Sequence, residues 1–260
     1  MASTTDLAEL ARRAALAGGA VIRSAVHRDA EAEPKGAGDY VTEVDRASER
    51  AIREVLEDEL PDLPVVGEEG GGREGPRHWL VDPLDGTTNF VHGFPIVGVS
   101  IALVHDGVPV VGVVHAPFLG DVWVAARGAG ATVERPDGRI EPIRVSAVPA
   151  ERAVVSTGFP FRRKDALPRY LRAMHAGLER FEDLRRPGAA ALDLAWVAAG
   201  VFDGFFELGL APWDVAAGGL LVEEAGGVVT DWAGGPDYLN GDILAGSPAV
   251  HAELLALAGR

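Results

Sequence analysis

Residues 79–90 read WLVDPLDGTTNF, an apolar run of the kind that forms a buried β-strand, closed by Asp82 and Asp85. The chain already carries a formal net charge of −15 at pH 7, so two more carboxylates at the end of such a strand call for a reason. Pro83 lies between the two aspartates and stiffens the turn, which lets Asp85 turn back beside Asp82. The stretch after it, Asp85-Gly-Thr-Thr-Asn, resembles a helix start whose free amide groups suit a phosphate.

The composition bounds the fold class and the compartment. A chain of 260 residues with 47% hydrophobic content fits one large domain, or two lobes that share an interface. The absence of cysteine excludes disulfides and thiolate metal sites, and it favours a reducing compartment. The first ten residues, MASTTDLAEL, hold acids where a signal peptide needs bases, and no apolar run approaches the roughly 18 residues of a membrane span. We therefore expect a cytoplasmic protein.

The charge balance limits the partners. With 24 Lys and Arg against 39 Asp and Glu, the field around the protein repels polyanions. We therefore expect no direct contact with nucleic acid and no binding to a membrane. If the ligand is an anion, something local must reverse the sign of the field.

The periodicity of apolar residues divides the chain into two lobes. In residues 1–150 we expect two helices and then two hairpins that form an antiparallel sheet, and in residues 151–260 an α/β lobe in which helices alternate with strands. The expected helices span residues 5–26, 43–60, 165–180, 189–200, 214–225 and a last one from 248. The hairpins span 96–117 and 121–146, and DGFFELGL at 203–210 is the clearest strand of the second lobe.

Four acidic patches stand out, each of them weak alone. They are VTEVD ending at Asp45, GEEG at 67–70, DPLDGTT at 82–88 and PWDVAAG at 212–218. An Asp-Gly pair is common in ordinary turns, an aspartate before an apolar run is often a helix cap, and glutamates in a glycine loop are usually solvated.

Taken together, the patches favour a metal site. Carboxylates that share a pocket repel by roughly 4 kcal/mol per pair at 4 Å and an effective dielectric of about 20, so they take up protons or bind cations. Because every candidate ligand is an oxygen, including the Leu84 carbonyl, the set selects Mg²⁺ or Mn²⁺ over zinc. Glu68, Asp82, Asp85 and Asp214 supply four negative charges and a phosphate monoester roughly two more, a sum that three divalent ions would balance.

Three of these motifs, in this order and spacing, resemble the inositol monophosphatase family of Mg²⁺-dependent, lithium-sensitive phosphatases. They are GEE at 67–69, DPLDGTTNF at 82–90 and PWDVAAGGLLVEEAGG at 212–227, and the likeness extends from KGAGDYVTEVD at 35–45 to the C-terminal helix. The resemblance implies a layered αβαβα sugar-phosphatase fold, a homodimer, and an active site between the lobes.

The resemblance also implies a ligand set for the metal ions. Glu68, Asp82 and the Leu84 carbonyl would bind the first ion, and Asp82, Asp85 and Asp214 the second. A third, weaker ion would lie near Glu68. The cofactor would be Mg²⁺ in two or three copies, with Mn²⁺ as a possible substitute.

The remaining roles follow from the same resemblance. Thr87, hydrogen-bonded to Asp45, would orient and help deprotonate the water that attacks phosphorus, and the amides of Gly86 and Thr87 would hold phosphate oxygens. The implied catalytic residues are Asp45, Glu68, Asp85 and Thr87. The implied substrate contacts are Gly86, Thr87, Gly188, Ala190, Glu207 and Asp214.

Several functions fit this pattern. A carboxylate at Glu207 can accept hydrogen bonds from two adjacent hydroxyls, which favours myo-inositol monophosphate or a related polyol phosphate, although a strand-end glutamate can also simply face water. The family often has Gly-Thr or Gly-Ser where this chain has Gly188–Ala189, which leaves the alcohol less defined. Histidinol-phosphate phosphatase on the same scaffold is an alternative. A different class is a regulatory binding protein that acts through its surface, for example on the transcription or ribosome machinery.

Overall fold

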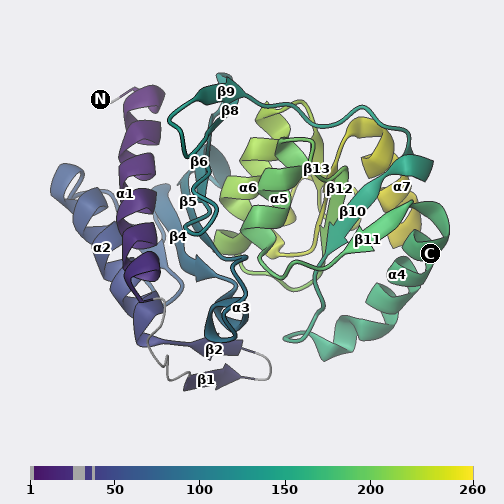
Figure 1. Ribbon diagram of the computed structural model, residues 1–260, viewed down its shortest axis with the longest axis horizontal. Coiled ribbons are helices and arrows are strands. Elements are labelled where there is room, and N and C mark those ends of the chain that lie inside the picture. The colour runs from purple at the N-terminus through teal and green to yellow at the C-terminus, as the bar shows by residue number, and fades with distance from the viewer. Residues whose placement is uncertain (1–2, 26–32, 37–38, 260) are drawn as a thin grey trace.

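The computed structural model describes residues 3–25, 33–36 and 39–259, which form five stacked layers (Figure 1). A helix pair, α1 and α2, covers one face of a seven-stranded sheet, and α5 and α6 lie between that sheet and a five-stranded one. Helices α4 and α7 cover the outer face of the second sheet. The αβαβα layering implied by the resemblance is confirmed.

The helices begin and end close to where the periodicity places them. The α-helices are α1 Thr4–Ser24, α2 Glu43–Glu59, α3 Thr87–Val91, α4 Leu167–Arg180, α5 Ala190–Ala198, α6 Pro212–Glu224 and α7 Pro248–Ala258. Three short 3₁₀ helices are η1 Ala150–Arg152, η2 Lys164–Ala166 and η3 Tyr238–Asn240. Helix α3 is short because Gly93 and Pro95 lie within four residues of its end, and neither residue favours a helix interior.

The first sheet has the order β3-β4-β5-β6-β7-β8-β9, and it is antiparallel apart from the β3–β4 pair. Its strands are β3 Val65–Gly67, β4 Arg77–Asp85, β5 Gly98–His105, β6 Val108–His115, β7 Val122–Ala126, β8 Gly130–Glu134 and β9 Ile140–Pro142. A separate hairpin joins β1 Glu33–Gly36 to β2 Asp39–Val41. Residues 37–38 of the motif at 35–45 lie outside the described part.

The second sheet has the order β11-β10-β12-β14-β13 and mixes parallel with antiparallel pairs. Its strands are β10 Val154–Thr157, β11 Asp183–Arg185, β12 Gly204–Glu207, β13 Val228–Thr230 and β14 Ile243–Gly246. The chain crosses from one sheet to the other between residues 142 and 154. Helices α5 and α6 pack on both sheets, so the division into two lobes at residue 150 stays a prediction.

Helices α5 and α6 form the centre of the core because they are apolar on nearly every side. Leu192, Leu194, Leu220 and Leu221 have no exposed surface and belong to one apolar cluster with residues of both sheets. A second cluster fills the space between α1, α2 and the first sheet, and a third joins α4 and α7 to the second sheet. The first turns of α5 and α6 are thereby fixed beside the end of β4. Within the described ranges, no helix combines the length and the apolarity that crossing a membrane requires.

Candidate active site

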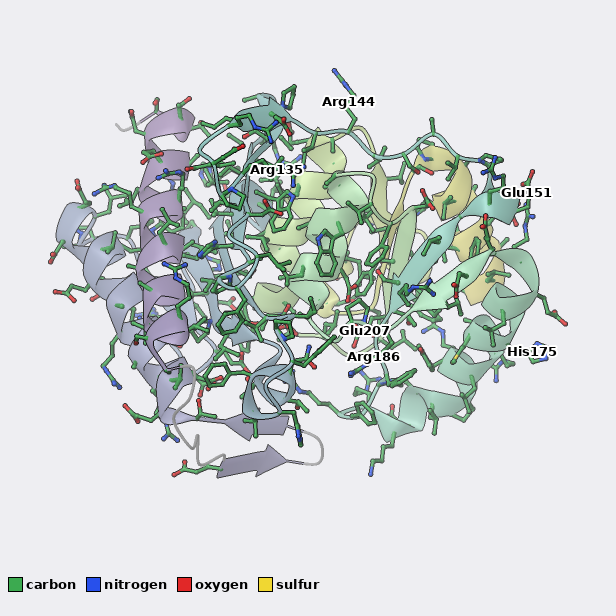
Figure 2. All side chains as sticks on the ribbon, in the orientation of Figure 1. Arg135, Arg144, Glu151, His175, Arg186 and Glu207 are labelled. Atoms are coloured by element: carbon green, nitrogen blue, oxygen red, sulfur yellow. The ribbon has the colours of Figure 1, made fainter. Side chains whose placement is uncertain are left out.

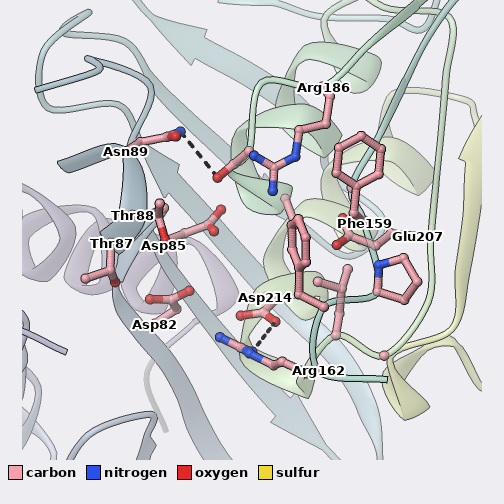
Figure 3. Close-up of a pocket in the computed structure, with 18 of the residues that line it drawn as sticks. Asp82, Asp85, Thr87, Thr88, Asn89, Phe159, Arg162, Arg186, Glu207 and Asp214 are labelled. Atoms are coloured by element: carbon pink, nitrogen blue, oxygen red, sulfur yellow. Dashed lines mark hydrogen bonds and ion pairs between the residues drawn. The ribbon is translucent and has the colours of Figure 1, made fainter. Parts of the chain in front are cut away.

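Carboxylates from three separate segments meet at the end of β4. Asp82 belongs to that strand, Glu68 follows the neighbouring strand β3, and Asp214 lies in the first turn of α6. One oxygen atom from each of these three residues lies within 4.8 Å of the other two. Figure 3 shows Asp82 and Asp214 in this pocket. Asp85 lines the same pocket. The structure therefore brings together all four acids that the sequence singles out.

The backbone holds each carboxylate in place. The Asp82 Oδ1 atom accepts a hydrogen bond from the Leu84 N–H at 3.0 Å, where the register of β4 against β5 shifts. Asp85 accepts from the N–H of Ala191 at 2.7 Å, which fastens it to the start of α5. Asp214 accepts from the N–H of Ala211 at 2.8 Å. The N-cap of α6 is Ala211 and Asp214 is the third residue of the helix, so Asp214 is not the N-cap itself; it binds the N-cap N–H with one oxygen atom and leaves the other for a second role.

The crowding of acids raises their proton affinity. The pKa of Asp82 lies well above its usual range, first because the side chain is buried and then because Glu68, Asp85 and Asp214 repel its negative charge. Burial, followed by the charge of Asp214, raises the pKa of Asp85 to about 7. Such a group is stable at neutral pH only when it takes up protons or holds cations.

A buried glutamate that the sequence analysis did not single out shapes the loop after β3. The carboxylate of Glu49, on α2, accepts hydrogen bonds from the N–H groups of Glu69 at 2.8 Å and Gly70 at 2.9 Å. Arg53 donates to the same carboxylate at 2.8 Å. A Cβ atom on Gly67 would lie 2.4 Å from it, so this close approach requires glycine. Glu49 thereby fixes the backbone directly after Glu68, and helical periodicity alone could not reveal that role.

Thr87 and Asp45 form a hydrogen-bonded pair at one wall of the pocket. The Thr87 hydroxyl lies 2.8 Å from Asp45 Oδ1 and 3.2 Å from the Leu84 carbonyl oxygen. Asp45 also accepts from the N–H of Thr42 at 2.9 Å, because it occupies the third position of α2. Burial raises the pKa of Asp45 despite these hydrogen bonds. Gly86, directly before Thr87, has a backbone φ of 91°, which residues other than glycine rarely adopt.

The second lobe supplies the opposite wall. Gly188, Ala190 and Glu207 all line the pocket. Glu207, at the end of β12, is half-buried and lines the pocket rather than the outer surface of the protein, and Figure 2 labels it near the centre of the molecule. Burial, and then the charges of Asp214 and Asp85, raise the pKa of Glu207 to about 8.

Two arginines and two phenylalanines complete that wall. The Arg186 guanidinium stacks 5.2 Å from the centre of the Phe159 ring and 5.7 Å from that of Phe161. Arg162 reaches the acidic residues themselves. Of the neighbouring Arg185 and Arg186, only Arg186 lines the pocket. The loop at 158–162 carried no signal that could have been noticed.

An amide side chain links the two walls. The Asn89 Nδ2 atom, in the DGTTNF motif, donates to the carbonyl oxygens of Ile96 at 2.7 Å and Pro187 at 3.0 Å. This connection holds the segment before α5 against α3. The motif thus has a structural part in addition to its acids.

With this geometry in hand, comparison with known proteins places the chain. The profile of the inositol monophosphatase family matches residues 3–259. The chain belongs to the inositol monophosphatase family. It is 43% identical to Nus factor SuhB of Pasteurella multocida over 252 residues, which cover 95% of this chain and 93% of that protein.

Two solved structures of the family show the same fold. The extragenic suppressor protein suhB of Bartonella henselae is 37% identical, with a TM-score of 0.91 and coverage of 98% of this chain and 99% of that one. The inositol monophosphatase of Anabaena is also 37% identical, with a TM-score of 0.85 and coverage of 97% and 95%. Members of this inositol monophosphatase family are generally metal-dependent.

The acidic cluster fits a metal ion. Its donors are carboxylate oxygens from Glu68, Asp82 and Asp214, with the Leu84 residue and Asp85 in the same pocket. An all-oxygen set of this kind suits hard divalent cations. The raised pKa values of Asp82 and Asp85 indicate that a positive charge, from protons or a metal ion, stabilises the cluster.

Proposed function

We propose that the protein is a Mg²⁺-dependent phosphomonoesterase that hydrolyses myo-inositol monophosphate or a related polyol phosphate to the alcohol and inorganic phosphate. The observation that carries the proposal is the meeting of Glu68, Asp82 and Asp214 oxygens within 4.8 Å, at the bottom of a pocket whose other wall can receive an alcohol. Membership of the inositol monophosphatase family supports the same reaction.

In this proposal the acids hold two or three Mg²⁺ ions, or Mn²⁺ in their place. Glu68, Asp82 and the Leu84 carbonyl would bind the first ion, and Asp85 and Asp214 would join Asp82 at the second. Bound divalent ions would neutralise the carboxylates and the substrate phosphate and act as Lewis acids on the phosphoryl group.

Thr87 and Asp45 would position the attacking water. Because the Thr87 hydroxyl donates its hydrogen to Asp45, its oxygen remains free to accept one from a water molecule in the pocket. The raised pKa of Asp45 makes this carboxylate a better proton acceptor than an exposed aspartate. The backbone amides of Gly86 and Thr87 would hold phosphate oxygens.

The second lobe would receive the alcohol. Glu207, Gly188 and Ala190 line the wall opposite the catalytic threonine, and Asp214 lies between the two walls. With its pKa near 8, Glu207 can donate a hydrogen bond as well as accept one, depending on its protonation. The hydroxyl groups of a polyol can accept a hydrogen bond from protonated Glu207 and donate hydrogen bonds to its carboxylate form.

The test is phosphate release from inositol 1-phosphate with and without Mg²⁺, alongside histidinol phosphate and other small phosphomonoesters. We expect turnover only with the metal, a higher kcat/KM for the polyol than for histidinol phosphate, and loss of activity in Asp85→Asn. Asp203→Asn is the matched control, because Asp203 is buried but binds the Val154 N–H at 2.6 Å, away from the cluster. No turnover across the panel would refute the proposal.

A second candidate function is favoured by the names of the relatives. Nus factor SuhB of Pasteurella multocida and of Escherichia coli are 43% and 42% identical to this chain. That name points to the transcription machinery as a partner, against our expectation from the net charge that nucleic acid has no direct part. Asp85→Asn separates the two roles: a variant without phosphatase activity that still restores growth to a strain lacking the gene would show that the surface carries the function.

The finer properties belong to the same proposal. A homodimer, inhibition by lithium and a cytoplasmic location are supported by the family and by the absence of cysteine from the sequence. Sedimentation of the purified protein and a lithium titration of its activity test the first two.

A further inference from the structure

Arg162 is the one described cationic side chain within 4.0 Å of the acidic cluster's carboxylate oxygens. Its Nη2 atom lies 4.0 Å from Glu68 Oε1 and its Nη1 atom 4.0 Å from Asp214 Oδ2. It therefore reaches two of the three residues whose oxygens converge within 4.8 Å, and Figure 3 shows its contact with Asp214. Glu68 follows a strand of the first sheet and Asp214 lies in the first turn of α6, so a single guanidinium contacts both of these segments.

The loop that carries Arg162 is anchored on the opposite wall. Phe159 and Phe161 make an edge-to-face contact with their ring centres 5.8 Å apart, and Arg186 stacks on both rings. Pro160 between them restricts the backbone further. The backbone at Arg162 is thus held in place, while the Arg162 side chain is 44% exposed and has room to move toward solvent.

The Arg162 guanidinium and a divalent ion bound at the same carboxylate oxygens would repel each other. An ion bound by Glu68 and Asp214 would lie beside the same oxygen atoms that attract Arg162, and two positive groups at that separation repel strongly where solvent is excluded. The Arg162 guanidinium supplies part of the positive charge that balances these carboxylates. Its contacts with Glu68 and Asp214 must therefore weaken when a metal ion binds.

We propose that Arg162 is an internal cation of the acidic site, which lowers the affinity of that site for divalent metal ions and stabilises it when they are absent. The proposal rests on the proposed function in one respect, the identity of Glu68 and Asp214 as metal ligands. It adds a residue that sets how much metal the protein needs.

The experiment compares Arg162→Gln with Arg163→Gln. Both variants remove one positive charge from the same loop, but Arg163 pairs with Asp165 at 3.2 Å and does not line the pocket. The dissociation constant for Mn²⁺ alone, without phosphate or substrate, is measured by calorimetry and by electron paramagnetic resonance of the free ion. Melting temperatures in EDTA are measured in parallel and report that each variant folds.

We expect Arg162→Gln to bind Mn²⁺ roughly tenfold more tightly than Arg163→Gln, which corresponds to about 1.4 kcal/mol. In EDTA it should melt below Arg163→Gln, because the cluster has lost its internal counter-charge. Arg162→Lys should bind Mn²⁺ less tightly than Arg162→Gln.

Equal or weaker Mn²⁺ binding by Arg162→Gln would overturn the proposal. This failure is distinguishable from failure of the phosphatase assignment. If no phosphomonoester is hydrolysed while Arg162→Gln still gains Mn²⁺ affinity, the inference stands and the assignment fails. If the wild-type protein turns over substrate and the two variants bind Mn²⁺ alike, the inference alone fails.

Discussion

Replacing Asp82 with asparagine should make the metal-free protein more stable and remove its response to metal. Asp82 is almost fully buried, and its carboxylate repels those of Glu68, Asp85 and Asp214. Asparagine has nearly the same shape and can still accept the hydrogen bond from the Leu84 N–H. The substitution therefore removes charge with little change in packing.

The size of the gain follows from the spacing of the oxygens. Two unit charges at the 4.8 Å limit of the cluster repel by about 3.5 kcal/mol at an effective dielectric of about 20. Proton uptake already relieves part of this repulsion in the metal-free protein, so we expect about 1 to 3 kcal/mol of added stability. For a chain of this size that corresponds to a rise in Tm of roughly 2 to 10 °C.

The assay is thermal unfolding at pH 7 in EDTA and in excess Mg²⁺. Asp82→Asn should melt above the wild type in EDTA, and Mg²⁺ should raise the Tm of the wild type but not that of the variant. The control Asp203→Asn should melt no higher than the wild type in EDTA and should keep the Mg²⁺ response. A lower Tm for Asp82→Asn than for the wild type in EDTA, or a wild-type Tm that does not change with Mg²⁺, would refute the reasoning that these carboxylates repel one another and are there to bind a cation.

Further predictions concern the two walls and the pH response. A Cβ atom at residue 158 would lie 2.0 to 2.1 Å from the Glu207 carboxylate, so Gly158→Ala should lower kcat/KM for a polyol phosphate about tenfold and leave p-nitrophenyl phosphate, which has no hydroxyls, nearly unchanged. Thr87→Val should lower kcat about 100-fold without changing the Mg²⁺ dissociation constant. The pKa of Asp85 in the folded protein, about 7, is higher than that of an ordinary aspartate. Proton binding by Asp85 therefore stabilises the metal-free fold fully at a pH below the ordinary aspartate pKa, and this stabilisation is lost as the pH rises through 7. The Tm in EDTA should therefore fall between pH 5 and 8, with a shallower slope in Asp85→Asn, and a rise over that range in the wild type would contradict the assignment.

The acids of the site could be predicted because each follows a local signal. Asp82 and Asp85 close an apolar strand, and Asp214 lies in the first turn of a helix that begins with a proline, so strand and helix rules place all three at element ends. Residue order also helped, since motifs at 67–69, 82–90 and 212–227 have a recognisable spacing.

Other features depend on how the layers pack and had no local signal. Glu49 looks like an ordinary charged residue of an amphipathic helix, yet its carboxylate is buried under a loop about 20 residues further along the chain. Arg162 lies in a loop whose approach to Glu68 is set by the position of the second sheet. The raised pKa of Glu207 likewise arises from burial and from distant acids rather than from its sequence neighbours.

The central claim is that acidic residues from three distant segments form one site for hard divalent ions. A crystal structure of the protein soaked in Mn²⁺, with anomalous scattering used to locate the ions, tests it most directly. We expect at least one Mn²⁺ bound by oxygens of Glu68, Asp82 and Asp214 together. Density for Mn²⁺ elsewhere on the protein, with none between these three carboxylates at saturating concentration, would contradict the account.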